Sequence, residues 1–208
     1  MCRRPTYTPM PTLRRRALQS AGMFLMRQSK GRPRLLRLDL DRPTPKESAP
    51  ALDLVVPTDL IIAAWRGLFP AERMTFLGGS KTGAQIRVSS SWDVTGANRS
   101  VVHVTASSAL LARTLLDFEA SGVRVAAWLH SHPGRGPTAT HPSQIDWRQD
   151  ADLRRDFGDC IVGFIATEDG YIRAWGHALS QGLVKLTFQG SSIEFIPGES
   201  HVYRLALR

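Results

Sequence analysis

Runs of apolar residues alternate with short polar segments along the middle of the chain and predict a series of strands. Residues 123–129 are Val, Ala, Trp and Leu with a single charged interruption, which is typical of a buried strand. Residues 74–77 and 84–89 predict two further strands around a glycine-rich turn at 78–83. Residues 101–105 are expected to extend the same sheet.

Three other segments favour helices. Residues 106–120 place Leu and Phe three and four positions apart, as one apolar helix face requires. A capped amphipathic helix is expected to begin around residues 57–59 and to end at Pro70. A polar helix is expected at residues 143–157, after a loop rich in Gly, Pro and Thr at 133–142.

The last part of the chain predicts a run of short antiparallel hairpins. Strands are expected at residues 161–166, 171–178, 183–188 and 193–196. Because strands and helices are interspersed, the whole pattern predicts a single α/β domain with a mixed, curved sheet flanked by helices. We place this domain at residues 51–200 and a C-terminal tail at 201–208.

A basic region precedes the predicted domain. The chain has 208 residues and a net charge of +9, but residues 1–38 contain ten Lys and Arg and no acidic residue, whereas the remainder has a net charge of −1. A first edge strand is expected at 34–40 and a Pro-rich linker at 41–50. We interpret residues 1–50 as a disordered basic arm and linker; a targeting segment and an upstream start codon stay open as alternatives. Because the domain itself is nearly neutral, a nucleic-acid enzyme is not favoured.

Composition narrows the class of protein further. With 42% hydrophobic and 22% charged residues, the chain can bury a core, which excludes fibrous and wholly disordered classes. Two cysteines cannot form a disulfide framework, so a reducing, cytoplasmic location is expected, with Cys160 as a small buried residue. No apolar run is long enough to predict a membrane span.

Candidate chemistry lies where the buried strand 123–129 ends. His130 and His132 are two positions apart, so their imidazoles should lie on one face, and Asp146 lies in the first turn of the helix that follows the loop. Two imidazoles and a carboxylate suit a zinc ion whose fourth position is left for water. Zinc lowers the pKa of such a water to about 7.

The spacing alone leaves a second interpretation open. A His-x-His sequence is often only a polar strand end, and Ser143-Gln144-Ile145-Asp146 is also a capping box, with Ser143 as N-cap. On spacing alone, the metal site and this structural interpretation have equal standing, because no Cys pair or HExxH motif supports the metal.

The complete sequence motif favours the metal-site interpretation over the structural one. His130-Ser131-His132-Pro133, a loop, and then Ser143-Gln144-Ile145-Asp146 resembles the JAMM motif of the JAB/MPN family of zinc metalloproteases. The resemblance covers about residues 55–180 and implies a JAB/MPN fold of cytidine-deaminase-like layout. It implies His130, His132 and Asp146 as zinc ligands and Ser143 as a donor to the oxyanion of the intermediate.

The family also has a catalytic Glu well upstream of the motif. Glu72 matches that position, because it precedes a short apolar strand that ends in glycine, and its implied role is to move protons between water and the leaving amine. Two features depart from the family pattern. The loop 133–142 is longer than in the commonest eukaryotic members, and Thr75 stands where the family often has Gly.

The resemblance implies an isopeptidase or peptidase that cleaves after the C-terminal tail of a ubiquitin-like protein or releases its conjugates. Bacterial members with this loop are similar to those of antiviral defence operons, so activating and conjugating enzymes of the same operon are expected partners. A JAMM peptidase acting on an unrelated peptide or a sulfur carrier stays open. So does a non-catalytic zinc or scaffold domain whose basic arm binds nucleic acid.

Overall fold

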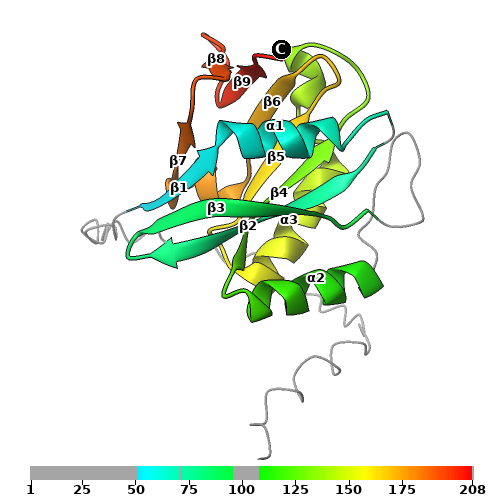
Figure 1. Cartoon of the computed structure of the whole chain (residues 1–208). Coiled ribbons are helices and arrows are strands. Elements are labelled where there is room, and N and C mark those ends of the chain that lie inside the picture. Colours follow the sequence, from blue (N-terminus) through cyan, green and yellow to red (C-terminus); the bar gives the residue numbers. More distant parts are fainter. Residues whose placement is uncertain (1–50, 71, 96–107, 208) are drawn as a thin grey trace, which may run out of the picture. The chain divides into compact units, whose positions relative to one another are not determined.

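The computed structural model describes residues 51–70, 72–95 and 108–207 (Figure 1). The predicted basic arm with its strand at 34–40, the linker at 41–50 and the predicted strand at 101–105 lie outside these residues. None of the described helices is long and apolar enough to cross a membrane.

The described strands form one mixed sheet of nine strands in the order β7-β1-β3-β2-β4-β5-β6-β9-β8. Their bounds are β1 Leu52–Pro57, β2 Met74–Thr82, β3 Gln85–Asp93, β4 Arg124–Ser131, β5 Val162–Ala166, β6 Tyr171–Trp175, β7 Val184–Gln189, β8 Ile193–Phe195 and β9 Val202–Leu205. β4 lies at the centre, antiparallel to β2 and parallel to β5. Its last seven residues are buried, as its apolar composition predicts.

The sheet is strongly curved and nearly closed. Phe188 on β7, the first strand of the order, packs edge-on against Tyr203 on β9, the last strand but one, with ring centroids 4.8 Å apart. Phe164 on β5 also packs against Phe188 in the same cluster, with ring centroids 6.3 Å apart. The curvature therefore brings the two ends of the strand order together, and the prediction of a mixed α/β domain with a curved sheet is confirmed.

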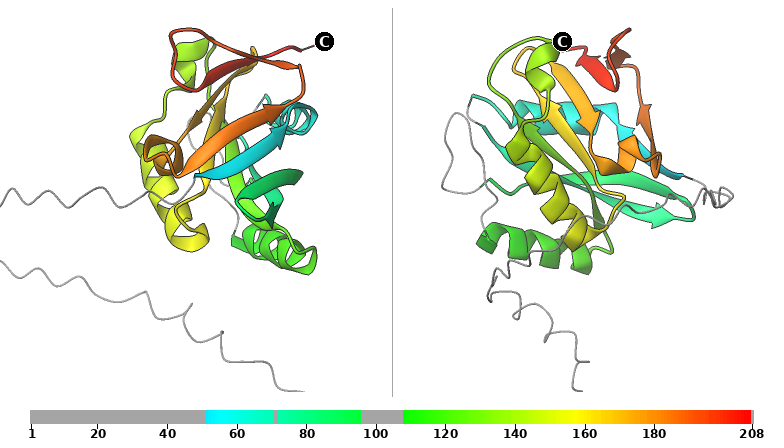
Figure 2. Two further views of the ribbon diagram at one scale, coloured as in Figure 1. Left: turned by 90° about the vertical axis from the view of Figure 1, so that its left-hand side faces the viewer. Right: turned by 180° about the vertical axis from the view of Figure 1, so that it is seen from behind.

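The helices lie on both faces of the sheet (Figures 1 and 2). Their bounds are α1 Thr58–Arg66, α2 Ser108–Ala120, η2 Pro137–Thr140, α3 Gln144–Phe157 and α4 His177–Ser180. α1 buries Ile61 and Ile62 in the larger core cluster, on one face of the sheet. Phe118 of α2 and Leu153 of α3 join a second cluster around Phe76 and Trp128, on the other face. The sheet thus separates two cores, and α3 belongs to the second one.

Several predicted elements differ from those observed. Residues 52–57 form β1, which the sequence pattern did not indicate, and β7 pairs with it in parallel rather than in a hairpin. The helix expected to be capped near residues 57–59 starts after Pro57 without a side-chain cap, and it ends at Arg66 instead of Pro70. The missed β1–β7 pairing has a clear cause: parallel pairing joins strands that are far apart in sequence, which local patterns do not encode.

Two further predictions change near the C-terminal half. Residues 202–205, placed in a tail, form β9 between β6 and β8 and are therefore part of the sheet. Cys160, expected to be buried, is exposed in the turn before β5. The apolar run that follows it starts one residue later, at the buried Ile161.

The close approach of β5 and β6 makes Gly163 a sensitive position. A Cβ atom at Gly163 would lie 2.7 Å from Nε1 of Trp175, its partner on β6. We expect Gly163→Ala to lower the free energy of unfolding by about 1–3 kcal/mol, because Trp175 is packed in a core and cannot move freely. Urea titration followed by circular dichroism measures the change.

Gly67→Ala is the matched control. Gly67 has a φ of −79°, and a Cβ there would meet its nearest neighbour at 3.4 Å, an ordinary contact. Its unfolding free energy should stay close to that of the wild type. An equal loss in both variants would mean that the effect is not specific to the β5–β6 contact.

Candidate metal centre

The end of β4 directs two histidines to the face of the sheet that α3 covers. His130 pairs with Met74 on β2 and is 2% exposed, and its ring stacks on that of Trp128 at 4.8 Å with an interplanar angle of 8°. The backbone N–H of His132 donates to the carbonyl of Ala166 at 2.9 Å, which continues the β4–β5 pairing beyond the strand. Both imidazoles therefore project from a fixed backbone on one face.

The start of α3 supplies the carboxylate. Ser143 is the N-cap in extended conformation, and its Oγ accepts from the backbone N–H of Asp146 at 3.3 Å. In return, the backbone N–H of Ser143 donates to Asp146 Oδ2 at 2.6 Å. The predicted capping box is thus confirmed, and it fixes the Asp146 side chain at the helix start.

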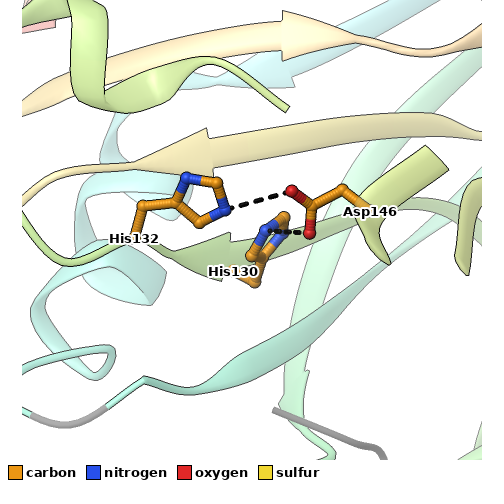
Figure 3. Close-up of side chains that lie close together, drawn as sticks. All are labelled: His130, His132 and Asp146. Atoms are coloured by element: carbon orange, nitrogen blue, oxygen red, sulfur yellow. Dashed lines mark ion pairs between the residues drawn. The ribbon is translucent and has the colours of Figure 1, made fainter. Parts of the chain in front are cut away.

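The three predicted ligands converge (Figure 3). Asp146 Oδ1 lies 3.1 Å from His130 Nε2, and Asp146 Oδ2 lies 3.2 Å from His132 Nε2. One potential ligand atom from each of the three residues lies within 4.8 Å of the other two. His130 and Asp146 are buried and His132 is partly exposed, so the group lies just beneath the surface and could hold a metal ion.

The ring nitrogens of the histidines fit a metal. His132 Nδ1 lies 3.1 Å from the carbonyl oxygen of Ala139, and because a carbonyl can only accept, Nδ1 carries the proton. Nε2 is then the ring nitrogen that faces Asp146. His130 is buried, yet neither of its ring nitrogens has a hydrogen-bond partner of good geometry among the described residues. Such an unsatisfied buried nitrogen is costly unless a metal or a proton completes it.

Burial and charge set the pKa values of the three ligands. Burial lowers the pKa of His130 and outweighs the opposing effect of Asp146. Burial also acts to lower the pKa of His132, but the hydrogen bond and charge of Asp146 and the Ala139 carbonyl raise it overall. Burial acts to raise the pKa of Asp146, and contacts with both histidines outweigh it and hold that pKa well below its usual range. The carboxylate is therefore ionised, and His130 is available as a neutral ligand.

Glu72 lies in the segment that enters β2 and faces the same group. The backbone N–H of Arg73 donates to Ser131 Oγ at 3.1 Å, and the N–H of Ser131 donates to the Arg73 carbonyl at 3.3 Å. Since Met74 is opposite His130 in this antiparallel pair, continuing the register places Glu72 opposite His132. The residue between the two histidines thus anchors the segment that carries the predicted acid.

The environment of Glu72 makes its carboxyl a weak acid. Burial raises its pKa from 4.5 to about 7; the charge of His132 lowers the pKa and that of Asp146 raises it. The side chain is 9% exposed. These effects of His132 and Asp146 place the Glu72 carboxyl within electrostatic reach of the centre. A pKa near 7 suits a group that both accepts and donates protons at neutral pH.

A pocket of about 250 Å³ is lined by residues around the start of α3, in β6 and in α4, and not by the candidate ligands. Pro142 and Trp147, which are next to the cap and to Asp146 in sequence, line it together with Trp175. Trp147 is 48% exposed and packs edge-on against Trp175 at 4.9 Å. Trp147 is thus largely exposed, whereas Trp128 is buried in the core.

Sequence reasoning missed the residues that surround His132. The Ala139 carbonyl contacts the imidazole, and Thr140 next to it is fully buried against Arg173 of β6. The one available signal was an arginine within the otherwise apolar strand Tyr171–Trp175. A charged residue in a buried strand needs partners, but the sequence does not say which.

Comparisons with known proteins give a weak structural similarity that carries no argument. No protein-family model and no curated protein matches this sequence. Among solved structures, the chain is similar to protein DSY2949 from Desulfitobacterium hafniense, whose structure was determined in solution. The two share 17% identity and a TM-score of 0.44, over 65% of this chain and 94% of that one. Similarity at this level carries no inference about activity.

If the centre binds metal, zinc should stabilise the fold through Asp146. At free zinc near 100 times its Kd, the expected gain is ~2.7 kcal/mol, seen as a rise in Tm over the chelator-treated protein. Asp146→Asn should abolish that rise, because an amide is a poor zinc ligand, although its oxygen still accepts from Ser143. Differential scanning calorimetry measures both proteins.

The control is Asp150→Asn, one helical turn further along α3. Asp150 is also buried, at 1% exposure, but it pairs with Arg154 rather than with His130 or His132. Its zinc-induced rise in Tm should equal that of the wild type. An undiminished rise in the Asp146 variant would show that zinc binds elsewhere.

The raised pKa of Glu72 predicts how metal-free stability depends on pH. Since the folded pKa lies above the unfolded value of 4.5, the neutral form is favoured in the fold, and stability falls as pH rises through about 7. Without metal, Glu72→Gln should therefore raise the unfolding free energy at pH 8, by about 1–2 kcal/mol. At pH 4 the two proteins should be equally stable.

Urea titrations at the two pH values test this, with Glu119→Gln as control. Glu119 is exposed on α2, and its replacement should leave the pH dependence as in the wild type. A Glu72 variant that was less stable than the wild type at pH 8 would mean that the ionised carboxylate stabilises the fold.

Proposed function

We propose that this chain is a zinc-dependent peptidase or isopeptidase of the JAMM type, with the JAB/MPN layout of its sheet. The observation that supports the proposal is the convergence of His130, His132 and Asp146 beside Glu72, whose pKa is about 7. Three ligands of this kind leave room for water or substrate, which is typical of catalytic rather than structural zinc.

His130 Nε2, His132 Nε2 and an oxygen of Asp146 would hold the zinc ion. Bound there, zinc would act as a Lewis acid toward a carbonyl and would make water more acidic. The surroundings of these side chains favour the protonation states that zinc ligands need. His130 is kept neutral by burial, and Asp146 is kept ionised by its partners.

Glu72 would move the protons of the reaction. Its carboxylate accepts a proton from the attacking water as the carbon–oxygen bond forms. It then gives that proton to the amine nitrogen as the carbon–nitrogen bond breaks, so that the carboxylate is regenerated. In the metal-free protein its pKa of about 7 lies between those of an ordinary carboxylate and an amine, which supports this dual role.

Ser143 would stabilise the oxyanion. Its Oγ already accepts from the Asp146 N–H in the capping box, which leaves the hydroxyl proton free to donate elsewhere. Ser143 is exposed, so a substrate carbonyl can reach this donor. A preorganised donor at that position favours the charge that develops in the transition state.

The proposed substrate rests on the sequence resemblance alone. It is the C-terminal tail of a ubiquitin-like protein, cleaved in precursor maturation or removal from conjugates. Activating and conjugating enzymes of the same operon would be its partners, with antiviral defence as the setting. The low cysteine content supports a cytoplasmic location.

Glu72→Gln tests the proposal directly. We expect cleavage of a ubiquitin-like protein fused through its tail to fall by about 10²–10⁴-fold, because an amide cannot carry the proton. Zinc content, measured by mass spectrometry of the metal, should stay at one per chain. Gel electrophoresis of the reaction products measures cleavage, and Glu119→Gln is the exposed control.

Two results would contradict the proposal in different ways. A Glu72 variant that cleaves at the wild-type rate would remove this residue from the mechanism. A wild-type protein that holds zinc but cleaves no ubiquitin-like fusion or unrelated peptide would instead indicate a non-catalytic zinc domain.

A further inference from the structure

Arg173 on β6 is buried and has a polar partner for each of its guanidinium nitrogens. It is 8% exposed. Nε donates to Thr140 Oγ1 at 3.1 Å, and Nη1 donates to the Ser200 carbonyl at 3.1 Å. Nη2 donates to Glu199 Oε2 at 3.0 Å and lies 3.4 Å from His141 Nε2. The side chain therefore joins the segment between β8 and β9 to the loop that follows His132.

The loop side of this network ends at the metal centre. Thr140 is fully buried in η2, and its hydroxyl donates to the Pro137 carbonyl at 2.6 Å, which closes the short helix. Between these two residues lies Ala139, whose carbonyl oxygen is 3.1 Å from His132 Nδ1. Arg173 thus reaches the His132 ring through one hydroxyl and one turn of backbone.

The backbone before η2 contains two glycines, so η2 needs side-chain hydrogen bonds to hold its position. Gly134 and Gly136 have φ values of 107° and 77°, in a region that glycine alone adopts readily. The N–H of Gly136 donates to Asp169 Oδ2 at 2.9 Å, which fixes the start of η2. Arg173 and Thr140 fix its end. Without the second contact, the Ala139 carbonyl would be held from one side only.

We propose that Arg173 is a positioning residue of the metal centre, which through Thr140 holds the Ala139 carbonyl against His132 Nδ1. The inference rests on the proposed zinc site. In that position the carbonyl keeps the proton on Nδ1 and the lone pair of Nε2 directed at the ion. Losing such an outer partner of a ligating histidine typically weakens metal binding by about 10–100-fold.

The contacts require an arginine rather than any cation. Nε, Nη1 and Nη2 donate in three directions of one plane, toward η2, the Ser200 carbonyl and Glu199. The single ammonium group of a lysine can satisfy Glu199, but it cannot present this planar fork. Arg173→Lys therefore preserves the charge pair and removes the link to Thr140.

The first test compares variants of the two residues in the full chain. We expect Arg173→Lys and Thr140→Val to bind zinc about 10–100-fold more weakly than the wild type, in competition with a chromophoric chelator. Thr140→Ser retains the hydroxyl and should bind like the wild type. Arg154→Lys is the matched control, because Arg154 also pairs with a carboxylate, that of Asp150, but has no hydrogen bond to η2.

The second test is a spectroscopic signature that needs neither zinc nor activity. NMR of the metal-free, ¹⁵N-labelled protein observes the Nδ1 proton of His132 and reports whether that proton is hydrogen-bonded. We expect a downfield Nδ1 proton that exchanges slowly with water in the wild type and in Thr140→Ser. In Arg173→Lys and Thr140→Val this proton should shift upfield and exchange faster.

The outcomes separate this inference from the proposed function. Wild-type zinc affinity and an unchanged Nδ1 proton of His132 in both Arg173→Lys and Thr140→Val would overturn the positioning role. A wild type whose Nδ1 proton is neither downfield nor protected from exchange would overturn it as well, even if neither variant folds. A wild type that binds no zinc would instead contradict the proposed function. The NMR result would still decide whether Arg173 orients His132.

Discussion

The centre depends on the contacts of the Asp146 carboxylate with His130, His132 and the Ser143 amide. The two carboxylate oxygens face different histidines, and one of them also accepts the Ser143 amide. A buried charge is stable only with such partners, so the strand end and the helix start must stay in register for Asp146 to be tolerated. The cap that starts α3 and the group that could hold the metal are therefore one structure, which accounts for the short spacing of Ser143 and Asp146.

The sheet supplies the second constraint, because it decides which face receives each side chain. Alternation along β4 places Trp128 in the core under α3 and continues with His130 and His132 at the edge of that same core. Antiparallel pairing with β2 then brings Glu72 to the same side. The larger core around α1, on the opposite face, contains none of these groups. The candidate site therefore lies on the face of the smaller core, and the larger core lies on the opposite face.

Local rules predicted the parts of this site that are close in sequence. Strand alternation places His130 and His132 together, and the capping box fixes Asp146; both follow from neighbours within a few residues. Glu72 depends on a pairing between distant strands, and only the family resemblance indicated it. Arg173 was missed because its partners Thr140 and Glu199 come from separate parts of the chain. The parallel pairing of β1 with β7 was missed for the same reason.

The order of these residues along the chain has a consequence for how the site assembles during folding. The three candidate ligands lie within residues 130–146, so docking α3 on the end of β4 brings them together with one short loop closed. Glu72 joins only when β2 pairs with β4 across a much longer separation. Assembly of the candidate ligands therefore needs one local contact, whereas bringing Glu72 to them needs a contact between distant segments. On the proposed function, the metal ligands and the base of one centre thus depend on contacts of very different sequence separation.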